Sequence, residues 1–329
     1  MSKWFERSVS PLWVILVSAI VVGVPAVQAQ DNGEPQGEEA GEPAVDRKRA
    51  MISTGLDSEA IAENRPDAAI WLEPPEEDRV RALFEPEADT PARGALMILA
   101  DEGQSAESGL AGALREPMAR AGWAVMTLGL EPPPYAVQQA RRQELPARPV
   151  APLASSGGDA GEGENDNDTD SVMIDVMDSV DVDELTDQYR DRISKALSAA
   201  VANLQERDYD RVAIAGVGRA AGHVARMATA GGDVSEMIWI APVFARADSG
   251  NLAEWLSEAG GKRVLELHSS RLAEQQSAGF RSPRQREVEF RRADITTYTR
   301  QPVAMAERPG PRDARALANR LSAWLASDR

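Results

Sequence analysis

Short runs of apolar residues alternate along this chain with longer amphipathic stretches. A continuous apolar run predicts a strand with both faces covered, whereas apolar residues spaced three or four apart predict a helix. From residue 94 onward the predicted strands are 94–100, 123–128, 212–215, 237–240, 263–267 and 295–300. The predicted helices are 106–121, 182–205, one that follows residue 218, 251–259, 282–292 and 313–327. This alternation favours an α/β fold with a doubly wound, mostly parallel sheet.

The segment before this alternation has a different pattern. Two short apolar runs, 69–72 and 80–84, flank a polar turn rich in Pro and Glu, which predicts an antiparallel hairpin. A short helix is expected within residues 47–65, where apolar residues are irregularly spaced. The sheet is therefore expected to begin with an antiparallel N-terminal hairpin.

The first 29 residues have the three parts of a secretory signal. Positively charged residues precede the apolar stretch 12–24, and Val27 and Ala29 place small side chains at positions −3 and −1 before Gln30. The apolar stretch is shorter than the roughly 20 residues that cross a bilayer as a helix. The pattern predicts export, most simply to a periplasm, with no membrane span after cleavage. An uncleaved anchor is the alternative.

Negative charge is concentrated in two tracts. The net charge is −17, and residues 31–46 and 149–189 contain six and twelve acidic side chains, respectively, with no Lys or Arg. Residues 30–46 are expected to form a disordered linker, and residues 149–179 a low-complexity insert in a single domain that spans 47–329. The remaining chain is close to neutral and has no strong basic stripe, which argues against a nucleic-acid partner.

Composition and spacing also argue against a metal or a cofactor. The chain has no cysteine and two histidines, which excludes disulfides, thiolate zinc sites and a His-rich metal site. Asp166, Asp168 and Asp170 resemble the start of a calcium loop, but the required glycine at position six and glutamate at position twelve are absent. We expect no cofactor.

Residues 211–230 carry the pattern most relevant to function. An apolar strand leads into Gly216-Val217-Gly218, and a helix of small residues follows. In an α/β-hydrolase this strand–turn–helix carries the nucleophile elbow, G-x-S-x-G. The register here is Gly216-x-Gly218-x-Ala220, so that glycine occupies the nucleophile position. Glycine adopts the unusual φ and ψ of this turn without strain, but it has no side chain that could attack a carbonyl.

The chain resembles an α/β-hydrolase and, more narrowly, a bacterial family called the domain of unknown function 3530. The segments that carry the resemblance are GALMILADEG, LREPMARAGWAVMTL, VAIAGVGRAAG, VLELHSSR, and TYTRQ followed by LANRLSAWL. They cover roughly residues 51–325. The resemblance implies a hydrolase-like sheet and no particular activity.

A serine hydrolase also needs a base after its last strand. No histidine follows the last predicted strand of this chain. His223 lies five residues beyond Gly218, where we expect a structural or surface role. His268 lies at the C-terminal end of a predicted strand, where ligand sites of α/β sheets open, and is the candidate for a binding or acid–base role.

Acidic residues replace the His-Gly that hydrolases often carry after their third strand. The sequence there is Ala100-Asp101-Glu102-Gly103, and two carboxylates at this place would oppose a developing oxyanion. Because adjacent residues on a loop diverge, we expect solvated loop acids rather than an acid–base pair. Arg219 begins the elbow helix, whose free N–H groups attract anions, so that Gly218 and Arg219 are candidates to bind an anionic ligand. The incomplete glycine pattern argues against a dinucleotide.

Arginines are frequent near the C-terminus, at positions 281, 284, 286, 291, 292 and 300. Their pattern indicates either a solvated helix face or a surface for an acidic partner, such as the insert at 149–179.

Taken together, these patterns predict an exported α/β-hydrolase-like protein that has lost its serine nucleophile and acts by binding. The partner, a small molecule or a protein, is not identified by the sequence. The alternative is a hydrolase with a rearranged site that combines His268 with Asp101, Glu102 or Ser269.

Overall fold

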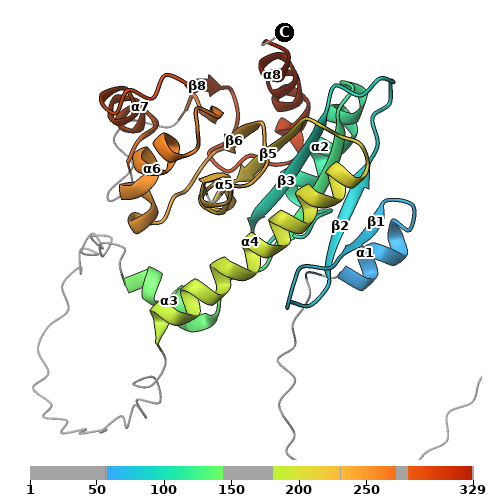
Figure 1. The fold of residues 1–329 in the computed structure, drawn as a ribbon, viewed down its shortest axis with the longest axis horizontal. Coiled ribbons are helices and arrows are strands. Elements are labelled where there is room, and N and C mark those ends of the chain that lie inside the picture. Colours follow the sequence, from blue (N-terminus) through green and yellow to red (C-terminus); the bar gives the residue numbers. More distant parts are fainter. Residues whose placement is uncertain (1–55, 57, 144–180, 230, 272–280, 328–329) are drawn as a thin grey trace, which may run out of the picture. The chain divides into compact units, whose positions relative to one another are not determined.

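The computed structural model describes residues 56, 58–143, 181–229, 231–271 and 281–327. Their strands form one eight-stranded sheet with the order β1-β2-β4-β3-β5-β6-β7-β8 (Figure 1). The strands are β1 Ala69–Leu72, β2 Val80–Glu85, β3 Ala95–Glu102, β4 Ala124–Leu130, β5 Val212–Val217, β6 Glu236–Ile240, β7 Arg263–Ser269 and β8 Tyr298–Val303. The helices are α1 Ser58–Asn64, α2 Gly109–Arg120, α3 Tyr135–Gln143, α4 Val182–Glu206, α5 Ala220–Thr229, α6 Arg246–Glu258, α7 Pro283–Arg292 and α8 Ala314–Ala326.

The predicted fold class is confirmed. Strands β1 and β2 pair antiparallel as the expected hairpin, and β2 pairs antiparallel with β4. The ladders that join β4, β3, β5, β6, β7 and β8 are all parallel. The sheet is therefore the mostly parallel, doubly wound sheet of an α/β-hydrolase fold, with an antiparallel start.

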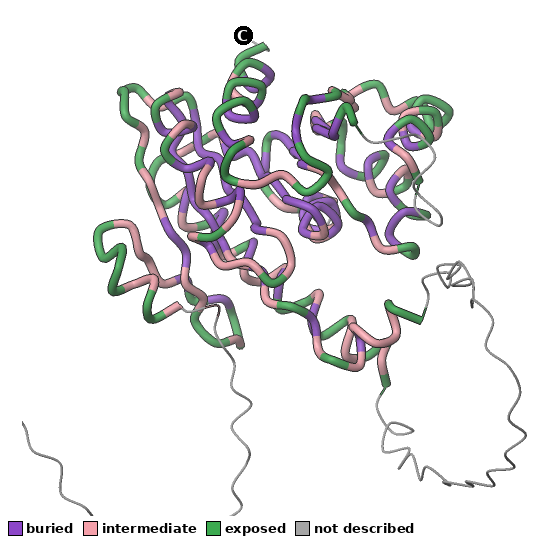
Figure 2. Tube along the Cα trace, turned by 180° about the vertical axis from the view of Figure 1, so that it is seen from behind, coloured by how far each residue is buried: buried purple, intermediate pink, exposed green. Residues whose placement is uncertain are grey.

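The central strands bury both faces, which explains their continuous apolar sequences. In β3, Met97 and Leu99 join the core on the side of α4 and α5, whereas Leu96 and Ile98 join the core beneath α2 and α8. Buried residues accordingly run through the central strands and the inner sides of the helices, whereas the edge strands β1 and β8 are mostly not buried (Figure 2). Because helices cover both faces of the sheet, the ends of the central strands are the places where it is left uncovered.

Three elements differ from the sequence prediction. Helix α3 was not predicted, because the prolines at 132–134 indicate a loop; the Pro134 carbonyl instead accepts the N–H of Gln138 at 3.0 Å and starts a helix. Strand β8 begins at Tyr298 rather than Ile295, whose N–H donates to the Phe290 carbonyl at the end of α7. Helix α6 begins five residues earlier than predicted.

Several predictions concern residues outside the described ranges. These are the signal sequence 1–29, the linker 30–46 and the insert 149–179, which contains the calcium-like aspartates. The described residues all belong to one compact unit, 51–329. Within them, no helix has the length and apolar content that a membrane crossing requires.

Candidate functional site

Gly218 lies at the tight turn between β5 and α5. Its φ is +58°, in the left-handed region that favours glycine. The Gly218 N–H donates to the Ile240 carbonyl at 2.9 Å, and its own carbonyl accepts the N–H of Val243 at the same distance. These bonds hold the turn against the end of β6.

Small residues allow α5 to approach β5 closely at this turn. A Cβ atom on Gly216 would lie 2.7 Å from the backbone of Ala220 and Ala221. Ala220 is fully buried. The geometry of a nucleophile elbow is thus present around residue 218 without a reactive side chain.

The carboxylate of Asp101 fills the space in front of this turn. Asp101 lies near the end of β3, where the register with β4 shifts between Leu99 and Glu102. Such irregularities redirect side chains at strand ends. One Asp101 oxygen, Oδ1, accepts the N–H of Arg219 at 2.9 Å and the N–H of Glu102 at 2.9 Å. The first N–H of the elbow helix is therefore bound by an anion that belongs to the chain itself.

This carboxylate stands where a side chain on residue 218 would be. A Cβ atom built on Gly218 would lie 2.4 Å from both Cγ and Oδ1 of Asp101. The sequence indicated an acid near an oxyanion site and, separately, an anion-binding helix end at Arg219. It gave no sign that the two features meet, because they lie more than a hundred residues apart.

Glu102 points to a different partner than Asp101. Its carboxylate pairs with Arg141 of α3 at 2.7 Å, and the two side chains are only 17% and 22% exposed. The unpredicted helix α3 thus contributes a cation to this edge of the sheet. Adjacent Asp101 and Glu102 diverge and do not form an acid–base pair.

His268 lies at the end of β7 and is 8% exposed. Its Nε2 is 3.5 Å from Arg300 Nη1, and its Nδ1 is buried without a hydrogen-bond partner among the described residues. Burial lowers the pKa of His268, Glu266 opposes this effect, and Arg300 adds to it. The ring is therefore kept neutral beside an arginine.

A buried ionic network surrounds His268. The fully buried Glu266 pairs with Arg286 of α7 and accepts the Tyr298 hydroxyl at 2.6 Å. Burial and the Glu266 charge raise the pKa of Tyr298. The neighbouring Ser269 hydroxyl donates to the Met305 carbonyl at 2.7 Å, so that its donor is already engaged. Glu266, Arg286, Tyr298 and Ser269 are therefore all engaged in contacts within the chain.

The structure does not bring together the residues of the alternative hydrolase site. Asp101 lies on β3 and His268 on β7, with β5 and β6 between them. Three strand spacings separate these strands by about 14 Å. Ser269 is buried against the loop after β8 rather than directed at Asp101. The sequence places these residues at strand ends but does not reveal the strand order that separates His268 from Asp101.

His223 lies on α5 and packs edge-on against Tyr189 of α4, with ring centroids 5.6 Å apart. Burial lowers the pKa of His223 to about 4, and the Asp248 charge partly opposes this effect. The ring is therefore neutral near pH 7 and takes part in helix packing, in the structural role expected from the sequence.

The C-terminal arginines are largely paired within the chain. Arg281 pairs with Glu289, Arg286 with Glu266, and both Arg291 and Arg300 with Glu287. This pairing favours a solvated and internally neutralised face over a docking surface for an acidic partner.

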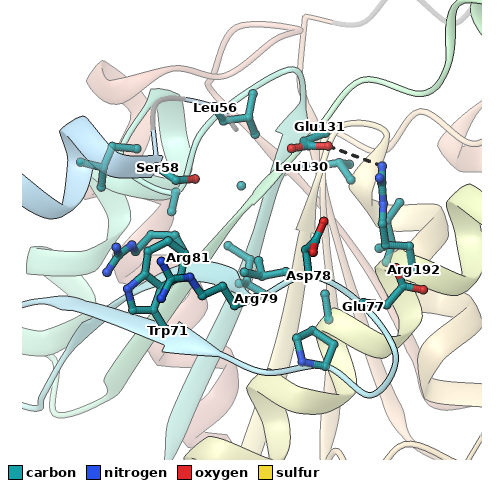
Figure 3. A pocket seen from close by; sticks show the side chains of 18 of the residues that line it. Leu56, Ser58, Trp71, Glu77, Asp78, Arg79, Arg81, Leu130, Glu131 and Arg192 are labelled. Atoms are coloured by element: carbon teal, nitrogen blue, oxygen red, sulfur yellow. Dashed lines mark ion pairs between the residues drawn. The ribbon is translucent and has the colours of Figure 1, made fainter. Parts of the chain in front are cut away.

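A large cavity lies apart from the elbow. It has a volume of about 930 Å³ and is bounded by α1, the β1–β2 hairpin, the end of β4, and α4 (Figure 3). The sequence did not indicate this cavity, because its walls come from four separated segments. Among the described residues, no group of three or more His, Asp or Glu side chains is placed so that it could hold a metal ion.

The sequence profile of one family, described as "Protein of unknown function (DUF3530)", matches residues 10–327. The chain belongs to the DUF3530 family. The resemblance drawn from the sequence segments is thereby confirmed over most of the chain. No curated protein sequence matches this DUF3530 chain.

Solved structures similar to the DUF3530 chain include three enzymes. The esterase domain of a Rhodothermus marinus protein is 10% identical, with a TM-score of 0.46 over 78% of this chain and 96% of that one. Est1E from Butyrivibrio proteoclasticus with bound ferulic acid is 11% identical, with a TM-score of 0.49 over 78% and 98%. A soluble variant of Saccharomyces cerevisiae monoglyceride lipase is 10% identical, with a TM-score of 0.44 over 78% and 94%.

Proposed function

We propose that this DUF3530 protein is exported and acts by binding, without the acyl-transfer chemistry of serine hydrolases. The supporting observation is the position of the Asp101 carboxylate. Its Oδ1 accepts the N–H of Arg219, the residue after the elbow position, and the N–H of Glu102 at the end of β3. In α/β-hydrolases, N–H groups from these two places form the oxyanion hole.

A resident carboxylate at this place opposes catalysis in two ways. The negative charge that develops on a substrate oxygen would meet a fixed negative charge where stabilising donors are needed. The carboxylate also fills the volume that a side chain on residue 218 would need. The Asp101 carboxylate lies at the N-terminus of α5, where a negative charge interacts favourably with the helix dipole and stabilises the helix. Asp101 therefore has a structural role.

A base is also lacking near the elbow. The chain has two histidines, of which His223 packs on Tyr189 and His268 lies on β7, two strand spacings or roughly 10 Å from β5, which carries the elbow. Export is supported by the signal pattern of residues 1–29. Both parts of the proposal are open to direct tests.

The catalytic part is tested with purified protein and a panel of p-nitrophenyl esters of increasing chain length. We expect no turnover from the wild-type protein, and none from Gly218→Ser or from Gly218→Ser combined with Asp101→Gly, because no base accepts the serine proton. Circular dichroism verifies that each variant is folded. Ester turnover by the wild-type protein that is lost in His268→Ala would overturn the proposal.

A further inference from the structure

The large cavity has an apolar floor and a charged rim. The floor consists of buried side chains from β3, β4 and α4, namely Leu99, Leu128, Leu130, Ile193 and Leu197. The volume of about 930 Å³ lies within the range of roughly 300–1,000 Å³ that is typical of small-molecule sites. Such a floor suits the apolar part of a ligand.

Two arginines on one side of the rim have no carboxylate partner among the described residues. The guanidinium carbons of Arg79 and Arg81 lie 4.1 and 3.4 Å from the centroid of the Trp71 ring. Trp71 and Arg81 face each other directly across the hairpin. The Nε of Arg81 is buried and has no acceptor. Two cations therefore share one aromatic ring without a salt bridge.

Arg79 and Arg81 are close enough for the charge of one to act on the other. Burial lowers the pKa of Arg81, the Arg79 charge lowers it further, and Glu59 partly opposes both. The lining as a whole also includes the acids Glu63, Glu77, Asp78 and Glu131, so that the positive charge is local to Arg79 and Arg81. An anion bound beside these two guanidinium groups would be stabilised. Guanidinium groups match the geometry of an anionic oxygen pair.

On the side of the cavity opposite Arg79 and Arg81, two acidic side chains form ion pairs with basic residues. Glu131 lies 3.5 Å from Arg192, and Glu77 lies 3.3 Å from Lys195. Figure 3 shows the Arg192–Glu131 pair across the cavity from Trp71 and Arg81, with the Asp78 side chain between them. The cavity therefore has one end that is suited to an anion, next to an apolar floor.

We propose that this cavity binds an amphiphile with a single anionic head group, with the head at Arg79 and Arg81 and the apolar body on the floor. This inference rests on the proposed binding function and names its site and ligand class. It does not involve the elbow, so that the two claims are tested separately.

The probe is dodecanoate at concentrations below micelle formation, with dodecanol and dodecyltrimethylammonium as neutral and cationic controls. Binding is measured by titration calorimetry and by Trp fluorescence, to which Trp71 contributes. We expect dodecanoate to bind at least tenfold more tightly than either control. A loss of the fluorescence change in Trp71→Phe, with calorimetric binding retained, would assign the signal to this site.

Two variants separate the roles of charge and volume. Arg79→Gln combined with Arg81→Gln should weaken dodecanoate binding at least tenfold and leave dodecanol binding unchanged. Ala196→Trp, which places a large side chain into the cavity from α4, should weaken both. The matched controls are Arg315→Gln with Arg320→Gln on the exposed side of α8, and Ser198→Trp on the exposed side of α4. Denaturation midpoints verify folding.

Failure of dodecanoate to bind, or binding that the arginine variants leave unchanged, would overturn this inference. Either result would leave the absence of ester turnover, and with it the non-catalytic assignment, untouched. Conversely, ester turnover at the elbow would overturn the proposed function whatever the cavity binds.

Discussion

Gly218 has a backbone conformation and a neighbour that both act against a side chain. Its φ of +58° disfavours residues with a Cβ atom, and that atom would approach the Asp101 carboxylate to 2.4 Å. The two costs have different origins, since one belongs to the backbone and the other to a contact. Substitutions can therefore separate them.

Gly218→Ala is expected to lower the free energy of unfolding by about 2 kcal/mol, from backbone strain together with displacement of Asp101. Urea denaturation measures this change. The control is Gly250→Ala in α6, where an added Cβ atom meets nothing within 4 Å. That change should be neutral or stabilise by up to about 1 kcal/mol, since alanine is the better helix former.

Asp101→Gly should remove the contact part of the Gly218→Ala cost and leave the strain. The double variant is then more stable than the two single changes predict, with an interaction energy of about 1 kcal/mol. Strictly additive effects would show that the carboxylate does not occupy the place of a side chain on residue 218.

At the scale of elements, the boundary between α4, α5 and α6 holds a histidine in its neutral form. His223 of α5 packs on Tyr189 of α4. Charged groups from neighbouring elements also act on it, namely Asp248, Arg141, Arg190 and Arg226. Because burial is the largest cause of the lowered pKa, protonation must weaken the packing of these helices.

The pKa of His223 is about 4 in the folded protein and about 6.5 in an unfolded chain. Between these values the unfolded chain binds more protons, so that stability falls as the pH decreases from 6.5 towards 4. We expect this residue to account for a loss of roughly 2 kcal/mol. His223→Phe keeps an aromatic ring against Tyr189, and its stability should depend less on pH over this range. Parallel denaturation curves for both proteins would contradict the assignment.

The helices whose starts were predicted correctly begin at capping residues that the local sequence displays. Helix α4 begins where Asp181 accepts the N–H groups of Asp183 and Glu184, and α7 begins with a capping box formed by Ser282 and Gln285. In the segment before β8, the Ile295 N–H donates to the Phe290 carbonyl, so that the strand begins only at Tyr298. Helix α3 follows three prolines that indicate a loop, and its Arg141 pairs with Glu102 of β3, a contact that the local sequence does not display. The same holds for the cavity, to which α1, the hairpin, β4 and α4 each contribute a wall.

At the scale of the whole molecule, pairing within the chain accounts for most of the charges that suggested a partner. The C-terminal arginines pair with Glu266, Glu287 and Glu289. Arg79 and Arg81, which both lie against Trp71, form no ion pair among the described residues. The cavity is thus the more promising place to look for a ligand.

The proposed export predicts that the protein recovered from the periplasm begins at Gln30. N-terminal sequencing or intact mass measurement would test this. Replacing the small residue at position −1, as in Ala29→Arg, should block cleavage and leave the precursor, since signal cleavage requires a small side chain there. A protein recovered with Met1 intact would contradict the proposal.

The sequence by itself determined the alternation of strands and helices along the chain apart from α3, the glycine at the elbow, and the absence of a histidine after the last strand. Apolar periodicity and backbone preference are local properties, and a single chain displays them directly. Only the tertiary structure decided that Asp101 binds the N–H of Arg219 at the elbow, that His268 lies apart from Asp101, and that Arg79 and Arg81 border an apolar cavity. These outcomes depend on which strands become neighbours and where side chains from distant segments meet, and the pattern along a single chain does not specify either.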